Sequence, residues 1–473
     1  MVLQGFFRSV CHRTDALSRQ NGRTVTTASA DGRSALSMEI SATDLDASTT
    51  AAAAPPAEPT SGHAWHRPPD PGGPDVGCPD AGDRADQPAH VRRWVRALIA
   101  VAAVALVVVG WSYVHALTAP GTDSLSVRSV EWLRGHGGAG MVSTVERWWY
   151  SHHQPAKGGP PPAVLAHPAE AQAPGASMPP SSPLTNAASS ALTQHLPAPP
   201  AIAPIASPAL PDEGVWRPAG RLVHGVPAVY TTALRPDPIH TSLATGVAWM
   251  DPTLLKAVLF AGVQLPGGAW ANEAPVPLSE RPSLVAAFNS GFRLPESRGG
   301  FYSEGRTARA LVPGAASLVI DTAGRPTVGM WGRDVQMGPS VASVRQNLAL
   351  IVDGGAPVAG LDQNLRGQWG ATLGNRLFVW RSGVGVTRNG ALVYAAGNGL
   401  SVASLARVLS AAGALRAMEL DINSEWTRYF SYDSADPANP AALTGTRLTP
   451  DMRSSPALYL EAETRDFFAF FAR

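Results

Sequence analysis

The longest apolar stretch of the chain runs from Ala97 to Leu117 and contains no charged side chain. A helix that rises 1.5 Å per residue needs about 20 such residues to cross a hydrocarbon core of about 30 Å. We therefore predict a transmembrane helix over residues 97–117, in contact with the lipid bilayer. The alternatives are a cleaved signal peptide, which would lie nearer the N-terminus and be shorter, and a buried core helix.

Arg92, Arg93 and Arg96 stand directly before this stretch. Positive charge beside a membrane helix is retained in the cytoplasm. We therefore predict a single-pass protein of the cell membrane, with a cytoplasmic N-terminus and an extracellular C-terminal domain. Residues 1–90 are rich in Ala, Ser, Thr, Asp and Pro without periodicity, which predicts a disordered cytoplasmic tail.

Two segments follow the apolar stretch. Residues 124–150 place apolar side chains at helical spacing, among them Val127, Val130 and Trp132, and this predicts an amphipathic juxtamembrane segment. Such a segment either lies on the bilayer surface or packs against the outer domain. Residues 154–212 are mainly Pro, Ala and Ser, a composition that predicts an extended stalk.

The pattern from residue 214 to residue 473 is that of a globular domain dominated by strands. An apolar run at 283–289 predicts one strand. Hairpins are predicted over 316–331, over 348–361 with its turn at Asp353-Gly354-Gly355, and over 377–397 around Asn389-Gly390.

Two helices are predicted among these strands. Asp251 with Pro252 at the first helical position indicates a helix that runs through Phe260. Ser401 is expected to cap a second helix, which ends at Gly413. Together these elements predict an α+β fold with mixed, mainly antiparallel sheets and a few packed helices.

Composition narrows the classes of partner and of site. The formal net charge of +1 gives no reason to expect a nucleic-acid partner. The two cysteines, Cys11 and Cys78, both precede the apolar stretch, so the outer domain has no disulfide available. The positive charge is almost all arginine, which is typical of a GC-rich genome such as that of an actinobacterium.

Motifs of several common enzyme classes are absent from the sequence: there is no P-loop, dinucleotide fingerprint, GxSxG elbow or HExxH. His224 and His240 are the only histidines of the outer domain after residue 214, and neither has a partner at metal-ligand spacing. We therefore expect no metal site, no cofactor and no histidine-based triad.

A run of polar residues follows the second predicted helix. Glu419, Asp421, Asn423 and Glu425 alternate along ELDINSE, so in an extended strand all four would lie on one face. They either line a cleft or face water.

Two further polar residues interrupt apolar strands. Asn289 ends the run at 283–289 and is followed by Ser-Gly-Phe-Arg293, which in isolation is typical of a turn. Arg381 lies within an apolar strand and needs a partner. That partner is either a structural carboxylate or a phosphate of a ligand, which a guanidinium binds well.

Three blocks of this domain resemble a known family. AAFNSGF (286–292), WRSGVGVTRNGALVYAAG (380–397) and LSVASLARVLSAAGALRAMELDIN (400–423) are similar in order and spacing to the phosphodiester glycosidase family, that of N-acetylglucosamine-1-phosphodiester α-N-acetylglucosaminidase-like domains. The similarity spans about residues 240–430, and the chain resembles an actinobacterial, membrane-anchored branch of the family.

The resemblance implies a hydrolase that cleaves a sugar-1-phosphodiester in a cell-envelope glycan or polysaccharide. Asp421, Arg381 and Asn289 match the family's motif positions. Asp421 would stabilise an oxocarbenium-like transition state, Arg381 would hold the phosphate and Asn289 would bind sugar or phosphate oxygens. Glu419 is a further catalytic candidate, and the predicted substrate-binding residues beside these motifs are Arg293, Asn423 and Glu425.

The third motif departs from the family pattern. Leu420-Asp421 is kept, but the Gly-Gly-Gly-Ser that follows in the family is replaced by Ile422-Asn423-Ser424-Glu425. Glycines permit close backbone approach to a ligand and positive φ angles. Their loss leaves two predictions open: a hydrolase, with its substrate unchanged or altered, or a glycan-binding or scaffolding domain without catalytic activity.

Overall fold

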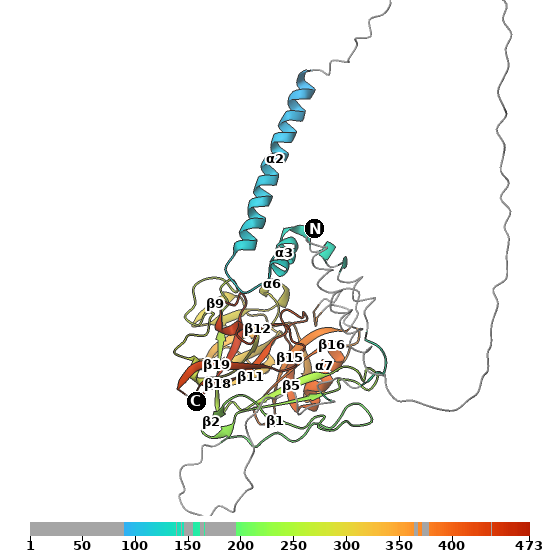
Figure 1. Ribbon diagram of the computed structural model, residues 1–473, viewed down its shortest axis with the longest axis vertical. Helices are drawn as coiled ribbons and strands as arrows, with labels where there is room; N and C mark the ends of the chain where they lie inside the picture. Colours follow the sequence, from blue (N-terminus) through green and yellow to red (C-terminus); the bar gives the residue numbers. More distant parts are fainter. Residues whose placement is uncertain are drawn as a thin grey trace, which may run out of the picture. The chain divides into compact units, whose positions relative to one another are not determined.

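The structure is a computed structural model (Figure 1), and it describes residues 89–138, 140–142, 144–145, 155–160, 165, 195–363, 368–370, 378–436 and 438–473. The chain divides into two units, Met1–Val109 and Gly110–Arg473. The predicted tail up to residue 88, both cysteines and most of residues 146–194, including much of the predicted stalk, lie outside the described residues.

The apolar stretch forms one helix, α2 (Ala89–Thr118), and its segment Arg92–Thr118 is long and apolar enough to cross a membrane. Large apolar side chains along it are mostly exposed, among them Leu106 with 72% of its surface accessible. Exposed apolar surface of this extent is typical of a segment that lies in lipid. The helix is thus consistent with the predicted single-pass anchor, whose orientation stays a prediction.

The second unit is built mainly from antiparallel sheets. The eight-stranded sheet has the order β1-β4-β5-β16-β15-β17-β13-β14. Its strands are β1 (Arg217–Pro218), β4 (Val229–Leu234), β5 (Thr245–Met250), β13 (Leu350–Asp353), β14 (Ala356–Pro357), β15 (Val379–Thr387), β16 (Leu392–Leu400) and β17 (Ala414–Glu419).

Two five-stranded sheets and a two-stranded ribbon make up the rest of the β structure in the described part of the chain. One sheet has the order β11-β10-β12-β8-β9, and the other has the order β19-β18-β7-β20-β6. Their strands and the ribbon β2-β3 are β2 (Leu222–Val223), β3 (Val226–Pro227), β6 (Leu255–Phe260), β7 (Leu284–Asn289), β8 (Phe301–Ser303), β9 (Arg306–Arg309), β10 (Ala316–Asp321), β11 (Pro326–Met330), β12 (Val341–Gln346), β18 (Tyr429–Asp436), β19 (Asn439–Arg447) and β20 (Phe467–Ala472).

Helices are few and short in this unit. Longest is α7 (Val402–Ala411), which packs against β13 to β17 of the eight-stranded sheet (Figure 1). Further helical elements among the described residues include α3 (Leu125–Leu133), the one-turn α6 (Leu294–Ser297), the π-helical turn η1 (Arg134–Gly138) and the 3-10 turns η2 (Arg281–Ser283) and η4 (Leu458–Leu460).

Both faces of the eight-stranded sheet are buried, which explains why so many of its strands are continuous apolar runs in the sequence. Along β16, Tyr394 and Ala396 lie in one core cluster, whereas Val393 and Ala395 lie in the cluster beneath α7. Because successive side chains of a strand point to opposite faces, the sheet has a core on each side. This position of β15, β16 and β17 places the ends of these strands inside the domain.

Most of the predicted elements are confirmed. The structure contains the predicted strand at 283–289 as β7, the three hairpins as β10–β11, β13–β14 and β15–β16, and the Ser401-capped helix as α7. The Ser401 side chain accepts a hydrogen bond from the backbone N–H of Ser404 at 3.0 Å. The mainly antiparallel fold is confirmed, but the domain is richer in β structure than an α+β fold implies.

The helix predicted from Asp251 through Phe260 is wrong. The Asp251 carboxylate instead caps a turn by accepting from the backbone N–H of Thr253 at 2.8 Å, and the chain continues as strand β6. β6 pairs with β20, and its successive side chains Leu259 and Phe260 enter two different core clusters. Pairing with a distant strand therefore outweighs the local helix signal.

The described end of the predicted stalk packs on the domain. Leu196 donates its backbone N–H to the Asp251 carboxylate at 2.7 Å, and the buried Ile202 joins the core beneath α7. Residues 196–212 therefore belong structurally with the globular domain.

Candidate active site

The polar residues that the sequence singles out converge where three strands end. Asn289 is the last residue of β7, Glu419 is the last residue of β17, and Arg381 lies near the start of β15. Register brings the ends of β15 and β17 together, because Gly383 pairs with Glu419, and a hydrogen bond from Asn289 to Ser382 joins the end of β7 to them.

Asn289 is buried and links the five-stranded sheet that contains β7 to the eight-stranded sheet. Its side-chain oxygen accepts from the Tyr394 hydroxyl at 2.9 Å and from the Arg428 backbone N–H at 3.1 Å. Its amide nitrogen donates to the Ser382 hydroxyl at 3.1 Å. All of these partners are structural, so Asn289 positions the strand ends and the end of the loop that precedes β18 at Arg428.

Arg381 is 1% exposed and pairs with Glu419, which is fully buried. The Arg381 Nε–H also donates to the Leu400 carbonyl at 2.8 Å. Glu419 Oε2 has no hydrogen-bond partner among the described residues. Burial raises the pKa of Glu419 to about 7, because the charged form is desolvated more than Arg381 compensates.

Asp421 lies just beyond the end of β17 and is 2% exposed. Its Oδ1 accepts from the backbone N–H of Ile422 at 2.8 Å and of Asn423 at 3.1 Å, and its Oδ2 accepts from Arg465 at 3.1 Å. Burial nevertheless raises the pKa of Asp421 to about 6. A carboxyl group in this range changes its protonation state near neutral pH, which suits acid–base or nucleophilic work.

Arg465 links Asp421 to an aromatic surface. The guanidinium carbon lies 3.5 Å from the centroid of the Trp426 ring, and that of Arg428 lies 4.7 Å from the same ring. Arg428 is held by Glu463 at 2.9 Å. Arginine stacked on an aromatic face keeps its donors in a fixed plane, in which they can bind an anion.

Three arginines lie near one carboxylate beside Asp421: Arg293, Arg465 and, at 3.6 Å from Glu131 Oε1, Arg134. Glu131 of α3 pairs through Oε2 with Arg293 and approaches Arg465 through Oε1 at 3.6 Å. Arg293 also pairs with Glu296 of α6. The Glu131 carboxylate thus marks a position where an anion lies between two guanidinium groups, one of which binds Asp421. α3 therefore packs against the outer domain, one of the two positions predicted for the juxtamembrane segment.

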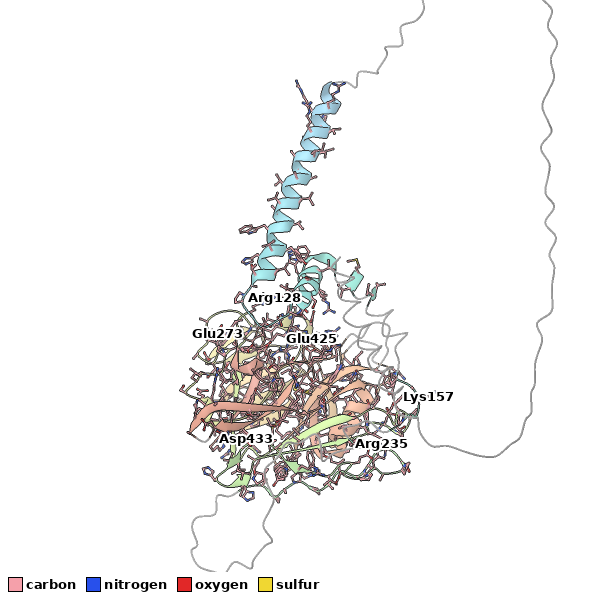
Figure 2. The ribbon with its side chains drawn as sticks, in the orientation of Figure 1. Arg128, Lys157, Arg235, Glu273, Glu425 and Asp433 are labelled. Carbon is pink, nitrogen blue, oxygen red and sulfur yellow. The ribbon has the colours of Figure 1, made fainter. Side chains whose placement is uncertain are left out.

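The segment after Asp421 forms two successive side-chain-capped turns. After Asp421, the Asn423 side chain accepts from the Glu425 backbone N–H at 2.9 Å, and its carbonyl accepts from Trp426 at 3.0 Å. Glu425 (Figure 2) points to Arg453 at 2.8 Å. The strand ends at Glu419, so the prediction that Glu419, Asp421, Asn423 and Glu425 share one strand face is wrong.

The cavity at this site is small. It has a volume of about 10 Å³, room for roughly one water molecule, and its lining includes Asn289, Trp426, Arg428 and Arg465. A larger hollow of about 400 Å³ lies elsewhere, between residues 197–201 and the β15–β16 turn, and Arg388 is the one charged residue in its lining. The small cavity therefore lies beside the charged cluster: Arg465, which binds Asp421, is part of its lining.

Metal sites require several ligand groups close together, typically side chains of His, Cys, Asp or Glu. The described residues contain no group of three His, Cys, Asp or Glu side chains placed to hold a metal ion. His224 contacts the carbonyl of Arg473 at 2.7 Å, and His240 pairs with Asp237 at 3.0 Å, both outside the site.

Several residues of this site were not predicted from the sequence. Arg465 and Asp466, which both line the small cavity, directly precede β20, and Glu131 comes from the juxtamembrane helix. The charged run EAETRD before the apolar strand FFAFFA is the one local signal that could have indicated Arg465 and Asp466. Nothing local indicates Glu131, because its partners are distant in the sequence.

Comparison with known proteins gives weak structural relations. No protein-family model and no curated protein matches the chain. The catalytic domain of zebrafish N-acetylglucosamine-1-phosphodiester alpha-N-acetylglucosaminidase is similar at 14% identity and a TM-score of 0.35, over 55% of this chain and 87% of that chain. A hypothetical protein from Synechocystis reaches 13% identity and a TM-score of 0.30, over 54% of this chain and 64% of its own. A Burkholderia pseudomallei protein described as exported reaches 11% identity and the same TM-score, over 50% and 75%.

Proposed function

We propose that the protein is a membrane-anchored, extracytoplasmic glycosidase that hydrolyses a sugar-1-phosphodiester of a cell-envelope glycan or polysaccharide. The observation that carries this proposal is the pair of arginines, Arg293 and Arg465, that converge on the Glu131 carboxylate beside the buried Asp421. The resemblance of the three sequence blocks to phosphodiester glycosidases supports the same reaction.

Arg293 and Arg465 suit a phosphodiester group. A phosphate has the charge and the hydrogen-bond acceptors that paired guanidinium groups bind best. In the substrate complex the phosphodiester would take the place of the Glu131 carboxylate. Arg465 connects this position to the small cavity, because it approaches Glu131 and also lines the cavity together with Trp426.

Asp421 would supply the chemistry at the sugar. Cleavage at C1 passes through an oxocarbenium-like state, which a carboxylate stabilises as a base, a nucleophile or a charge partner. The leaving group is a phosphate monoester, a stable anion, so the arginines assist its departure without a strong general acid. Arg381, Glu419 and Asn289 would position the strand ends that carry Asp421.

Arg381 thus takes the structural role that its sequence left open, and Arg465 takes the phosphate contact. Arg293 keeps its predicted contact with substrate. Asn423 would orient Asp421 through its backbone N–H. Glu425 is directed to Arg453, at the edge of this arrangement.

The experiment that tests the proposal uses the full chain in detergent. Release of phosphate monoester is measured over a panel of sugar-1-phosphodiesters that differ in the sugar and in the second phosphate substituent. Turnover of at least one member is the expected result. Lack of release across the panel by folded protein would overturn the proposal.

A glycan-binding or scaffolding domain without catalytic activity is the second candidate function. The segment after Asp421 favours it, because Ile422-Asn423-Ser424-Glu425 stands where the family that the sequence resembles has Gly-Gly-Gly-Ser. Saturable binding of a sugar-1-phosphodiester without turnover would support this candidate, whereas turnover would exclude it.

The pKa of Asp421 gives the site a predicted pH dependence. Because burial raises this pKa to about 6, Asp421 is ionised above that value and protonated below it. A carboxylate that acts as base or nucleophile works in the ionised form, so kcat/KM is expected to rise with pH around a midpoint near 6. A steady-state pH profile measures it. A profile that is flat between about pH 5 and pH 8 would contradict this role.

The same shift predicts the opposite trend for stability. The pKa values of Asp421 and Glu419 are raised from 3.8 and 4.5 to about 6 and about 7. Their contribution to folding is therefore fully present below the unfolded values and is lost as pH rises through the folded values. Activity gained with rising pH should thus accompany some loss of stability.

Glu131→Gln tests whether the Glu131 carboxylate occupies the position of the substrate phosphate. Removal of its charge frees Arg293 and Arg465 for the substrate, so KM is expected to fall by about tenfold, which corresponds to one charge-assisted hydrogen bond. Glu461→Gln, the same change at an exposed residue, is the matched control. An unchanged or higher KM in Glu131→Gln would show that the two arginines bind no substrate anion.

A further inference from the structure

We infer that the sugar-1-phosphodiester acted on at this site is carried by a membrane lipid, so that the departing phosphate stays in the bilayer as a lipid phosphate monoester. The inference rests on the proposed function and adds the class of substrate to it. It follows from how the segment after α2 joins the site.

The residues directly after α2 form part of the wall of the site. α2 ends at Thr118, and the Thr122 hydroxyl donates to Glu463 Oε2 at 3.0 Å. The Thr464 hydroxyl donates to Asp123 Oδ2 at 2.8 Å. Glu463 lines the site cavity, and Thr464 directly precedes Arg465, the partner of Asp421.

Chain length limits how far this wall lies from the end of α2. An extended chain covers at most about 3.5 Å per residue, so the four residues from Thr118 to Thr122 span no more than about 14 Å. Arg128, labelled in Figure 2, shortens the path further, because its guanidinium donates to the carbonyls of Leu117 at 2.8 Å and Gly121 at 2.6 Å. The site therefore lies close to the point where the chain leaves α2.

α3 brings the Glu131 carboxylate and its arginine partners close to α2, because α3 folds back beside the last turns of α2. Trp132 donates its indole N–H to the Ser112 hydroxyl at 3.1 Å, and the hydroxyls of Tyr113 and Ser129 lie 2.8 Å apart. The rings of Tyr113 and Trp132 meet edge to face at 5.0 Å between centroids. Tyrosine and tryptophan favour the membrane–water interface, where one end is apolar and the other is hydrated.

One helix therefore contacts both regions. Ser129 and Trp132 of α3 contact α2, whereas Glu131 contacts Arg293 and Arg465. Ser112 lies six residues before the end of α2, about 9 Å along a helix of 1.5 Å rise. If α2 crosses the bilayer, the arginine pair lies at the depth of the lipid headgroups.

A lipid-linked substrate presents its phosphodiester at this depth. Its lipid chain stays in the hydrocarbon, its phosphate lies with the headgroups, and its sugar projects into water. A diester in a soluble polymer has no such positioning. Confinement of the enzyme and the lipid-linked diester to one surface raises the effective concentration of the substrate at the site.

The reaction balances without a further reactant. Water adds its hydroxyl group to C1 of the sugar while the bond from C1 to the bridging oxygen breaks. The electron pair of that bond stays on the oxygen, which leaves as part of the lipid phosphate monoester. The proton of the water passes through the Asp421 carboxylate to solvent.

The test compares two diesters that share one sugar-1-phosphate. The full chain is reconstituted in phospholipid vesicles with either a long-chain polyprenyl diester in the bilayer or the methyl diester in solution. Turnover of the lipid-carried diester at equal total concentration is expected to exceed that of the methyl diester by about tenfold or more. Equal turnover, or turnover of the methyl diester alone, would overturn the inference and leave the proposed function standing. Turnover of neither diester would overturn both the inference and the proposed function.

A pair of insertions tests the physical cause. A flexible Gly/Ser insertion of about 20 residues, with a mean reach of about 25 Å, is placed after Ala119, and the same insertion is placed between Ser181 and Ser182 as the control. The first is expected to remove the preference for the lipid-carried diester, so that the ratio of its turnover to that of the methyl diester falls to about one. The control is expected to change neither rate. Full activity of the first variant on the lipid-carried diester would contradict the role of the connection after α2.

Discussion

Replacement of Asp421 by asparagine is expected to lower turnover of a sugar-1-phosphodiester by on the order of a thousandfold. The introduced amide is nearly the same size as the carboxyl group and can still accept from the N–H groups of Ile422 and Asn423. It has no negative charge with which to stabilise an oxocarbenium-like state and cannot act as base or nucleophile. Initial rates of phosphate-monoester release measure the loss.

The control for this variant is Asp433→Asn, an identical change at an exposed position of β18 labelled in Figure 2. It should keep full activity. Circular dichroism and thermal unfolding of Asp421→Asn should resemble those of the unmodified chain. Retention of more than about a tenth of the activity would exclude Asp421 from general acid–base or nucleophilic catalysis.

Replacement of Arg381 by methionine is expected to destabilise the domain by about 3–5 kcal/mol. It leaves the Glu419 carboxyl group, which is fully buried, without its arginine partner. The thermal midpoint of the domain should fall by roughly 10 °C, because about 2–4 °C is lost per kcal/mol in a domain of this size. Thermal unfolding followed by tryptophan fluorescence measures it.

Two further variants distinguish the effect of losing the ion pair from the effect of losing a long side chain. Arg388→Met, at the exposed turn of the β15–β16 hairpin, should leave the midpoint unchanged. In the double variant Arg381→Met/Glu419→Gln the buried group cannot ionise, so much of the lost stability should return. A destabilisation of less than about 1 kcal/mol in Arg381→Met would show that the burial of Glu419 does not depend on this ion pair.

Local sequence signals predict those elements that local interactions determine. Asn389-Gly390 and Asp353-Gly354-Gly355 specify their hairpins, and Ser401 specifies the start of α7. The segment Leu255–Phe260 was predicted as a helix because Asp251-Pro252 is a good helix start. Its pairing with β20, which lies near the other end of the chain, decides its structure.

The residues of the candidate site likewise fall into those that the sequence could identify and those that it could not. Asp421, Glu419 and Asn289 could be identified because polar residues at the ends of apolar strands are visible in the sequence. Their arginine partners were assigned less well: Arg381 pairs with Glu419, and Asp421 pairs with Arg465 from the segment before β20. Which cation meets which carboxylate depends on strand register between distant segments, and no local pattern records it.

The most direct test of the central proposal follows the oxygen of water into the products. The full chain hydrolyses a sugar-1-phosphodiester in water labelled with the heavy oxygen isotope, and mass spectrometry locates the label. Cleavage between C1 and the bridging oxygen predicts label in the sugar and none in the phosphate monoester. Label in the phosphate would indicate attack at phosphorus by a phosphodiesterase, and would contradict the assignment of Asp421 to the sugar and of Arg465 and Arg293 to the leaving phosphate.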